Sequence, residues 1–355
     1  MKYLEVNKKD TEQIKKLLEK IKAFDKTRKI IQNKNKILIP ILNISNGKIK
    51  KHIVKLFDYS ILNLKAKIQK QGSRIDQNQS KNFKKYENIA RGYDILGNIA
   101  IIKYINKSEK SKKLIGKAEQ IAKWIINSNP SIKTVVAQTS PISGKFRLRK
   151  FKYISGIKTF IATYKENNCI FKFDIRKTFF SNRLSYERSR INKLIKPKEA
   201  IIVMFAGIGP FAIVIAKQHK LTNIICIELN KNAVHYLKEN IKLNKIENIK
   251  AELGNVKKIY SKYKNFANRV IVPMPKSSID YLDQILSVCQ KTAIIHIYVF
   301  GDRDTVFAKT SKAIEEHARK NNYKAKILFK RIVRPYSAKE IEIVVDFKIS
   351  KSTKK

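Results

Sequence analysis

The feature of the sequence that most constrains the fold is a glycine turn between an apolar strand and a helix. The apolar run Ala200–Val203 leads into MFAGIGPFAI (204–213), and a helical pattern follows. Gly207 and Gly209 allow the chain to turn sharply and let a ligand come close to the backbone. Pro210 stands where proline favours the first turn of a helix. Strand, glycine turn and helix in this order predict the start of a doubly wound nucleotide-binding domain.

A carboxylate follows the next apolar strand, as such a domain requires. Glu228 ends the run that begins at Asn223, and an acid about 20 residues after the turn can accept hydrogen bonds from both hydroxyls of a ribose. The third glycine of a dinucleotide site and the GxxxxGK[ST] of a triphosphate site are both missing. We therefore expect a nucleoside ligand. The alternative is a glycine turn that only packs a strand against a helix.

The charge of the chain indicates a polyanionic partner. Lysine and arginine total 77 against 28 acidic residues, which gives a formal net charge of +49. Such a charge predicts strong attraction to nucleic acid. Lysine, isoleucine and asparagine are abundant throughout, as in the products of AT-rich genomes, so part of the excess is compositional.

Cysteine and histidine usage gives no sign of a metal site or a disulfide framework. The three cysteines are far apart, and the five histidines lack ligand spacing, so we expect buried thiols in a reducing compartment and no metal. No apolar run has transmembrane length, and the N-terminus does not resemble a signal peptide. We expect a cytoplasmic protein without membrane attachment, and a monomer, because nothing indicates an obligate partner.

Hydrophobic periodicity divides the chain into three expected domains. Residues 1–70 predict a small α+β unit with strands at 2–6 and 37–42, a helix at 10–22 and further helix near 49–57. The polar stretch 71–85 predicts a linker. Residues 86–195 predict a second α+β unit, with a strand at 99–105, a helix at 118–127 and paired strands near 134–137, 159–164 and 170–174.

Residues 196–355 predict an α/β domain. Strands alternate strictly with helices, at 200–206, 223–229, 249–253, 269–274 and 292–300, which indicates a parallel sheet wrapped by helices. Two final strands, 324–331 and 340–349, predict an antiparallel hairpin. The expected fold is a Rossmann-like sheet of the class I methyltransferase type with this terminal hairpin, preceded by two smaller α+β domains.

Seven motifs in a fixed order carry a resemblance to a known family. They are GYDILGNIAII (92–102), SGKFRLRK (143–150), KTFFSNRLSYERSRI (177–191), MFAGIGPFAI (204–213), ELNKNAVHYLKENIKLN (228–244), VPMPKSSIDYLD (272–283) and IIHIYVFG (294–301). Together they resemble the archaeal/eukaryotic type of tRNA (guanine-N1)-methyltransferase, which modifies the guanosine 3′ of the anticodon at position 37. The resemblance covers nearly the whole chain. It implies three domains, S-adenosylmethionine as donor, and tRNA as partner, with the N-terminal module binding the tRNA elbow.

The chemistry of this reaction agrees with residues in two of the motifs. Guanine N1 carries a proton at neutral pH, so methyl transfer needs a base for that proton and a cation near O6. The resemblance places the base at Glu187 and the cation at Arg147, and it makes Arg183 a phosphate or loop-shaping contact. The alternatives are that Glu187 is an exposed acid paired with Arg183 on a helix, and that Arg147 is an ordinary surface cation.

The resemblance also implies the residues that contact the donor. In the turn and after the second strand they are Phe205, Ala206, Gly207, Gly209, Pro210, Glu228 and Leu229. Asn255 stands where the family usually has an aspartate that contacts adenine N6, and an amide oxygen can accept the same hydrogen bond. His296 and Tyr298 lie on a later strand, and we interpret them as core packing.

Two positions depart from the family pattern. Val203 stands where many relatives carry an acid that helps to hold the methionine ammonium group. In VPMPK (272–276), Pro273 replaces an asparagine whose amide oxygen accepts a hydrogen bond from the target base, which leaves only backbone carbonyls as acceptors. Pro275 keeps this turn stiff, and Lys276 adds a cation near the substrate.

These departures leave alternatives open. A less specific pocket is compatible with a bifunctional enzyme that also C-methylates the wyosine intermediate at the same nucleotide. A second alternative is a tRNA-binding homologue with weakened catalysis. A methyltransferase acting on amine groups of ribosomal RNA or DNA ranks last, because that chemistry relies on the side chain missing at Pro273. A related branch that transfers an aminocarboxypropyl group lacks the N-terminal module.

Overall fold

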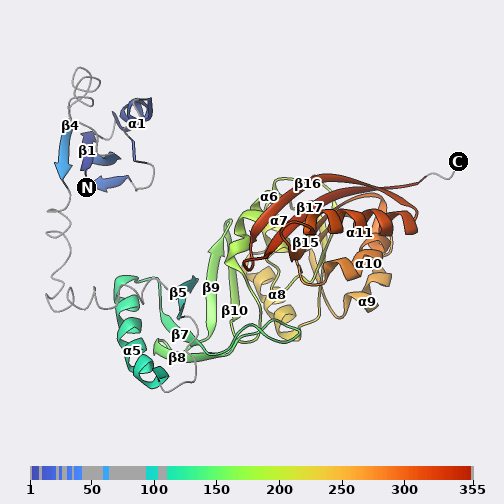
Figure 1. Ribbon diagram of the computed structural model, residues 1–355, viewed down its shortest axis with the longest axis horizontal. Coiled ribbons are helices and arrows are strands. Elements are labelled where there is room, and N and C mark those ends of the chain that lie inside the picture. Colours follow the sequence, from blue (N-terminus) through green and yellow to red (C-terminus); the bar gives the residue numbers. More distant parts are fainter. Residues whose placement is uncertain are drawn as a thin grey trace. The chain divides into compact units, whose positions relative to one another are not determined.

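The computed structural model describes residues 2–7, 10–20, 24–25, 30–33, 36–41, 59–63, 93–102 and 110–352. The chain divides into two compact units, Met1–Lys85 and Tyr86–Lys355 (Figure 1). The helix predicted near 49–57 and the linker predicted at 71–85 lie outside the described residues.

The described residues of the first unit form a four-stranded antiparallel sheet and the helix α1. The sheet has the order β2-β3-β1-β4. The elements are β1 (Lys2–Asn7), α1 (Thr11–Lys20), β2 (Ile31–Asn33), β3 (Lys36–Ile41) and β4 (Tyr59–Asn63). Apolar side chains of α1 spaced four apart, Ile14 and Leu18, pack on Leu4, Val6 and Ile39 of the sheet.

The second unit begins with a four-stranded sheet of order β5-β6-β7-β8, against which α5 packs. These elements are β5 (Tyr93–Leu96), β6 (Ile99–Ile102), α5 (Lys110–Ser128), β7 (Thr134–Gln138) and β8 (Phe151–Gly156). The hairpin of β9 (Ile161–Glu166) and β10 (Cys169–Asp174) forms a separate two-stranded sheet. The predicted pairing of 134–137 with the two later strands is therefore wrong. The crossover helix α5 brings β7 parallel to β6 instead, and β8, which was not predicted, covers its other edge.

The rest of the second unit is built on a seven-stranded sheet of order β13-β12-β11-β14-β15-β17-β16. Its strands are β11 (Ala200–Met204), β12 (Asn223–Glu228), β13 (Ile249–Leu253), β14 (Ala267–Val272), β15 (Cys289–Asp302), β16 (Tyr323–Pro335) and β17 (Glu340–Lys351). The first five run parallel, and β17 is antiparallel to both of its neighbours. The predicted parallel sheet with a terminal antiparallel hairpin is confirmed.

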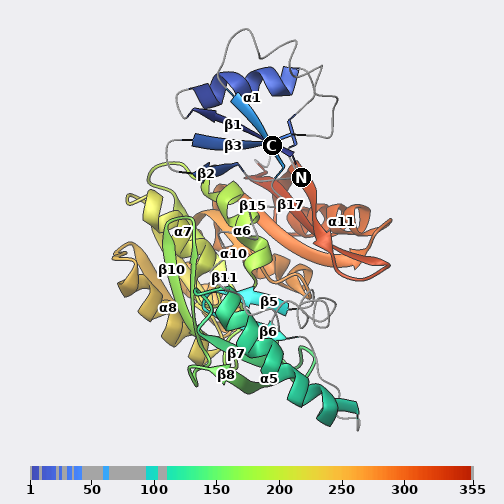
Figure 2. The same cartoon turned by 90° about the vertical axis from the view of Figure 1, so that its left-hand side faces the viewer.

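Helices cover both faces of this sheet, and α8 and α11 lie on opposite sides of it in Figure 2. The helices are α6 (Ser185–Asn192), α7 (Pro210–Gln218), α8 (Lys231–Leu243), α9 (Val256–Ile259), α10 (Leu282–Val288) and α11 (Val306–Lys320). Side chains of α6, α7 and α8 share one hydrophobic cluster with β10, and those of α9, α10 and α11 share another. The first cluster also includes Ile99 and Phe171, so the middle of the chain and the large sheet are packed as one body.

Asparagine side chains of α8 fix the hairpin β9–β10 to the large sheet. Asn240 Oδ1 accepts from the Lys172 N–H at 2.8 Å, and Asn244 bonds both the N–H and the carbonyl of Ile170. Asn230 Nδ2, just before α8, donates to the Lys177 carbonyl at 2.9 Å. Because these bonds hold the chain on both sides of Asp174, the segment that leads from β10 to α6 has a defined path past the glycine turn.

Candidate active site

The glycine turn has the backbone conformation that the sequence predicts. Phe205, Gly207 and Gly209 have φ angles of 57°, 58° and 87°. Pro210 is the first residue of α7, and the Ala206 N–H donates to the Ile227 carbonyl of the next strand at 3.1 Å. The turn is therefore bound to β12 at the point where the carboxylate follows.

Glu228 lies directly beside the turn. Its Oε2 accepts from the Gly207 N–H at 2.8 Å, and its Oε1 accepts from the Asn230 N–H at 2.7 Å. Each carboxylate oxygen keeps further acceptor capacity, so the pair of ribose hydroxyls can still be bound. Asn255, expected near the adenine, accepts from the Lys257 N–H at 3.0 Å and caps α9, which leaves its second acceptor site for a ligand.

The space around the turn fits a nucleoside donor. A Cβ atom built on Gly207 has only the Phe179 carbonyl oxygen nearby, at 3.9 Å, whereas one built on Gly209 would lie 2.3 Å from Leu237 Cδ1. Gly207 therefore faces open space and Gly209 faces the core. Phe205 packs edge-on against Tyr281 with ring centroids 4.9 Å apart, which adds an aromatic wall at the same end of the sheet.

Substitutions at the two glycines are expected to separate donor binding from folding. Gly207→Asp places a carboxylate in the open space and should abolish binding of S-adenosylmethionine, while its left-handed backbone conformation costs about 1–2 kcal/mol of stability and leaves the protein folded. Gly209→Ala forces Leu237 to move and should lower stability by about 1–3 kcal/mol. Isothermal titration with the donor and thermal melts test both. Normal donor binding by Gly207→Asp would show that the donor lies elsewhere.

Glu187 is buried at the start of α6, with 1% of its surface exposed. Its Oε2 accepts from the Tyr298 hydroxyl at 2.9 Å and from Arg190 Nε at 3.0 Å, and its Oε1 accepts from an Arg331 guanidinium nitrogen at 2.8 Å. Glu187 is thus neither exposed nor paired with Arg183. Three donors from α6, β15 and β16 hold the carboxylate in one orientation.

Two of the donors to Glu187, Tyr298 and Arg331, lie in the middle one of three successive rows of residues across β15, β17 and β16. One row is His296–Asp346–Phe329, the next is Tyr298–Val344–Arg331, and the third is Phe300–Glu342–Arg334. Alternate residues of a strand share a face of the sheet, and Glu187 bonds the two ends of the middle row. The rows on either side each contribute a buried carboxylate, Asp346 and Glu342.

The row that contains His296 extends the hydrogen bonds around Glu187 into a polar network in the core. Arg190 donates to Asp346 Oδ2 at 2.6 Å and to Oδ1 at 3.3 Å, and His296 Nδ1 lies 2.8 Å from the same Oδ1. His296 Nε2 lies 2.7 Å from an Arg269 nitrogen, and Arg269 is paired with Glu199. Because Arg269 can only donate, Nε2 is an acceptor, so the imidazole is neutral with its proton on Nδ1.

The neutral state of His296 predicts a pH dependence of stability. Burial lowers the pKa of His296 below its ordinary value of 6.5, while Asp346 opposes that shift. The unfolded chain therefore binds more protons below that pH, and the free energy of unfolding should fall as the pH drops from 7 to 5. His296→Asn should flatten this dependence in urea titrations at pH 7, 6 and 5. An unchanged slope would assign the effect to other groups.

Arg147 lies in a strained turn beside two aromatic rings. Its φ angle is 56°, and its guanidinium carbon is 4.8 Å from the ring centroid of Phe179 and 5.8 Å from that of Phe300. Its Nε is buried without a hydrogen-bond partner, and burial lowers the pKa of the side chain. A buried donor without a partner is costly, so this N–H is available to an acceptor of a ligand.

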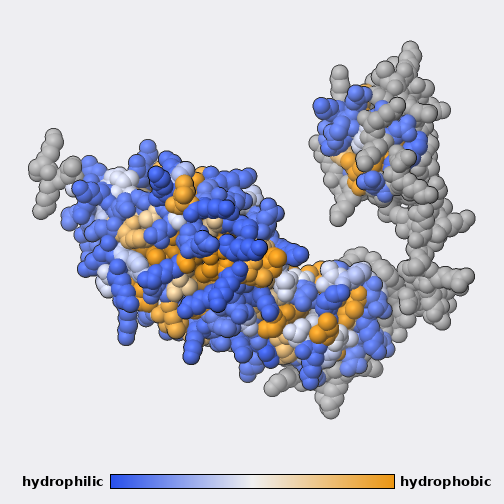
Figure 3. Space-filling model, turned by 180° about the vertical axis from the view of Figure 1, so that it is seen from behind, coloured by the Kyte–Doolittle hydropathy of each residue, from blue (hydrophilic) through white to orange (hydrophobic). Residues whose placement is uncertain are grey.

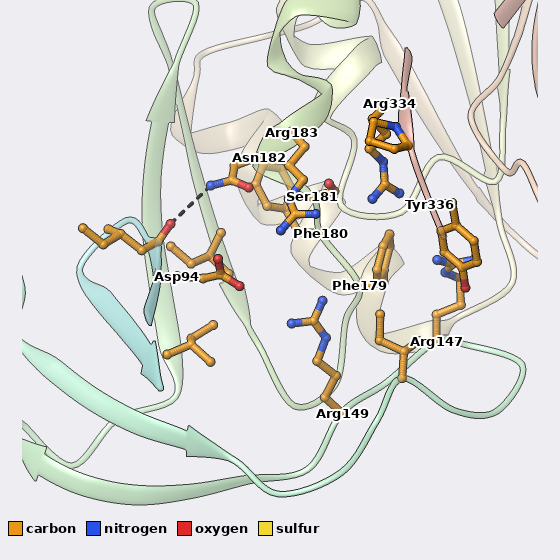
Figure 4. Close-up of a pocket in the computed structure, with 15 residues that line it drawn as sticks. Asp94, Arg147, Arg149, Phe179, Phe180, Ser181, Asn182, Arg183, Arg334 and Tyr336 are labelled. Atoms are coloured by element: carbon orange, nitrogen blue, oxygen red, sulfur yellow. Dashed lines mark hydrogen bonds between the residues drawn. The ribbon is translucent and has the colours of Figure 1, made fainter. Parts of the chain in front are cut away.

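Arg147 also lines a cavity of about 260 Å³ together with further arginines (Figure 4). Arg149, Arg183 and Arg334 line the same space, with Asp94 across from Arg149. Arg334 is paired with Glu342 at 2.6 Å, whereas no ion pair of Arg147, Arg149 or Arg183 occurs among the described residues. The cavity therefore has an excess of positive charge and suits a phosphorylated ligand.

Buried Glu342 lies within electrostatic range of both proposed catalytic residues. Burial raises the pKa of Glu342, Arg334 and Arg147 lower it, and the like charge of Glu187 raises it further. The Glu342 carboxylate therefore interacts electrostatically with both Arg147 and Glu187.

The proline segment after β14 lies at the same end of the sheet. Pro273 and Pro275 are half-buried, and Lys276 is exposed. The Pro275 carbonyl already accepts from the Phe300 N–H at 2.9 Å, so Phe300 links this segment to the ring contact of Arg147. Val203, where an acid was expected, is fully buried in the hydrophobic cluster of α7.

Sequence reasoning missed most of the side chains that hold Glu187. Tyr298 and His296 were interpreted as core packing; both are buried, but they also bond the polar network. Arg190, Arg331 and the acids of β17 were not considered. One signal was present: Glu342 and Asp346 interrupt the apolar strand EIEIVVDFKI four residues apart, and therefore on one face.

Three family models match consecutive parts of the chain. They are the tRNA methyltransferase 5 N-terminal domain (residues 4–49), the TYW2 N-terminal domain (79–159) and the TRM5/TYW2 methyltransferase domain (162–327). The tRNA (guanine(37)-N(1))-methyltransferase Trm5b of Pyrococcus abyssi is 32% identical over 343 residues, 96% of this chain and 97% of the relative. The chain belongs to the TRM5/TYW2 methyltransferase family.

Solved structures of family members have the same fold. The crystal structure of Pyrococcus abyssi Trm5b matches with a TM-score of 0.66 and 29% identity over 99% of both chains. A complex of aTrm5 and tRNALeu matches with a TM-score of 0.64 and 28% identity over 98% of this chain and 99% of the other. Methanocaldococcus jannaschii TYW2 in complex with AdoMet matches with 0.58 and 25%, over 73% of this chain and 99% of its own.

One family member has two activities in its name. Taw22 of Nanoarchaeum equitans, a tRNA (guanine(37)-N(1))/4-demethylwyosine(37)-methyltransferase, is 30% identical over 274 residues, 63% of this chain and 88% of the relative. The N-terminal match at residues 4–49 and the full-length coverage associate this chain with the Trm5b relatives rather than with TYW2, which spans only 73% of it.

Proposed function

We propose that this protein transfers a methyl group from S-adenosylmethionine to N1 of the guanosine at position 37, 3′ of the anticodon, in tRNA. The observation that carries this proposal is the buried carboxylate of Glu187, fixed by three donors at the end of a segment that passes the donor turn. Full-length likeness to Trm5b relatives supports the same reaction.

Each group of site residues has a separate role in this reaction. The donor supplies an electrophilic methyl group, and Gly207, Glu228 and Asn255 hold its nucleoside. Glu187 accepts the proton that leaves guanine N1. Arg147, whose Nε has no partner, donates to O6, where negative charge develops as the proton leaves. The target base must leave its stack to reach these groups.

The charge of the protein supports binding of an RNA backbone. Hydrophilic side chains dominate the described part of the face drawn in Figure 3, and the cavity beside Arg147 carries uncompensated guanidinium groups. We assign Arg183 a phosphate contact and Lys276 a second one. Pro273 and Pro275 shape the wall beside the base. Phosphate contacts give binding a steep salt dependence.

The domain roles and the cellular setting complete the proposal. Residues 1–70 bind the tRNA elbow, 71–85 link this module, 86–195 recognise RNA and contribute catalytic residues, and 196–355 bind the donor. No helix of the described residues is long and apolar enough to cross a membrane. We propose a cytoplasmic monomer.

A second candidate function is methylation of the wyosine intermediate at the same nucleotide. Pro273 favours it, because no side-chain amide at this position selects one base edge, and Taw22 has both activities in its name. We rank it second, because the N-terminal match and the full-length coverage associate the chain with Trm5b.

Methyl transfer to tRNA transcripts tests the proposal. Unmodified transcripts with G or A at position 37 are incubated with labelled S-adenosylmethionine. Label should enter the G37 transcript only. Tight tRNA binding without transfer to either would indicate the weakened homologue instead.

A further inference from the structure

The two oxygens of Glu187 have different kinds of partner. Oε2 accepts from Tyr298 and Arg190, whereas Oε1 accepts from Arg331. Tyr298 is completely buried. The side chain of Arg190 is 13% exposed, and Asp346 binds it through two further hydrogen bonds. The partners of Oε2 are therefore fixed parts of the core.

Arg331 is held far less firmly. It lies on β16, the edge strand of the sheet, and its side chain is 35% exposed. Besides Glu187 it contacts the ring of Tyr186, 4.2 Å away, and Tyr186 is itself 62% exposed. The pairing of β16 with β17 shifts register on both sides of Arg331. Among the three donors, Arg331 can leave Glu187 without disturbing the core.

The contact with Arg331 works against proton acceptance. Oε1 keeps a second acceptor site, but the Glu187 side chain is only 2% exposed and that of Arg331 is 35% exposed, so Arg331 is the partner of Glu187 that faces an arriving N–H. A guanidinium bound there neutralises the charge that attracts the proton. The contact also has a structural reason, because Arg331 adds a second cation beside Glu187, whose negative charge is repelled by that of nearby Glu342.

Bound RNA supplies a competing partner for Arg331. Arg183 and Arg334, which line the cavity, lie four residues before Glu187 and three residues after Arg331. An RNA backbone that follows these two segments from the cavity would bring a phosphate to the exposed side of Arg331. Guanidinium binds phosphate in the same bidentate manner as carboxylate.

We propose that Arg331 is a positioning residue that masks Oε1 of Glu187 until a phosphate of the bound RNA draws its guanidinium away. The base is then uncovered only when the substrate is in place. This rests on the proposed role of Glu187 as the proton acceptor.

The first experiment compares Arg331→Ala and Arg331→Lys with the wild type, and uses Lys326→Ala, an exposed cation of the same strand, as the matched control. Single-turnover rate constants at saturating tRNA and tRNA dissociation constants are measured at several salt concentrations. Arg331→Ala should weaken tRNA binding about three- to tenfold and reduce the salt slope by about one. Its rate constant at saturation should equal or exceed that of the wild type. Arg331→Lys should restore affinity, and Lys326→Ala should leave the rate unchanged.

The second experiment identifies the phosphate. Two-piece tRNAs carry single neutral methylphosphonate linkages around nucleotide 37. One linkage should slow the wild type at saturation and have no further effect on Arg331→Ala. A tenfold or larger fall in the saturated rate of Arg331→Ala would overturn the proposal, as would equal effects of every linkage on both proteins. Either result would mean that Arg331 stays bound to Glu187 throughout the reaction. Glu187→Gln in the same assay tests separately whether Glu187 is the proton acceptor. Full activity of this variant would refute that role, whatever Arg331 does.

Discussion

Glu187→Gln is expected to lower the single-turnover rate of methyl transfer about 10²- to 10⁴-fold. The amide cannot take the proton from guanine N1, while its size keeps the shape of the site. The glycine turn and the cavity do not use Glu187, so the dissociation constant for S-adenosylmethionine should change little and that for tRNA should not rise. Rapid-quench measurements with saturating tRNA give the rate, and titrations give the two affinities.

The control for this variant must account for lost stability. Glu187 neutralises Arg190 and Arg331, and breaking a buried pair costs about 3–5 kcal/mol. Glu166→Gln is the matched change, because Glu166 and Arg188 form another buried ion pair. It should lower the melting temperature to a similar extent and leave the rate within about threefold. Equal losses of rate in both variants would mean that Glu187 acts through stability alone.

Arg147→Ala is expected to lower the rate about 10²- to 10³-fold, as does the loss of other donors to a developing oxyanion. Its guanidinium is held against Phe179 and Phe300 and is desolvated, so its field on O6 is strong. Arg147→Lys should not restore the rate, because an ammonium group lacks the planar fork and the ring stacking. The loss should appear in kcat rather than in KM for tRNA.

Lys145 gives the matched control for Arg147. It is an exposed cation two residues earlier in the same turn, and Lys145→Ala should keep kcat within about twofold. A wild-type kcat for Arg147→Ala at saturating tRNA would refute the assignment of Arg147 to O6.

Local patterns in the sequence were sufficient to predict the conformation of the glycine turn and the sheet. The turn depends on Gly207, Gly209 and Pro210, whose conformational preferences act within a few residues, and strand–helix alternation gives the parallel sheet. The position of Glu228 beside the turn could also be predicted, because the carboxyl ends of adjacent parallel strands lie at the same edge of the sheet. Strand pairing was harder: β7 pairs with β6 across a crossover helix, and such long-range pairing has no local signal.

The environment of Glu187 could not be predicted for the same reason. Two of its three partners come from β15 and β16, more than 100 residues away in the chain, and the hairpin register brings Arg331 and Tyr298 to opposite sides of Val344. On a helix considered alone, Glu187 is as well placed to pair with Arg183. Burial by the sheet decides between the two arrangements, and burial is a tertiary property.

Identification of the methylated nucleoside is the decisive test of the proposed reaction. A G37 tRNA transcript is methylated with isotopically labelled S-adenosylmethionine, digested to nucleosides and to oligonucleotides, and analysed by mass spectrometry. If the protein methylates N1 of guanosine 37, all transferred label will be in N1-methylguanosine at position 37. Label in a different methylated guanosine, label at another nucleotide, or transfer of an aminocarboxypropyl group would contradict it.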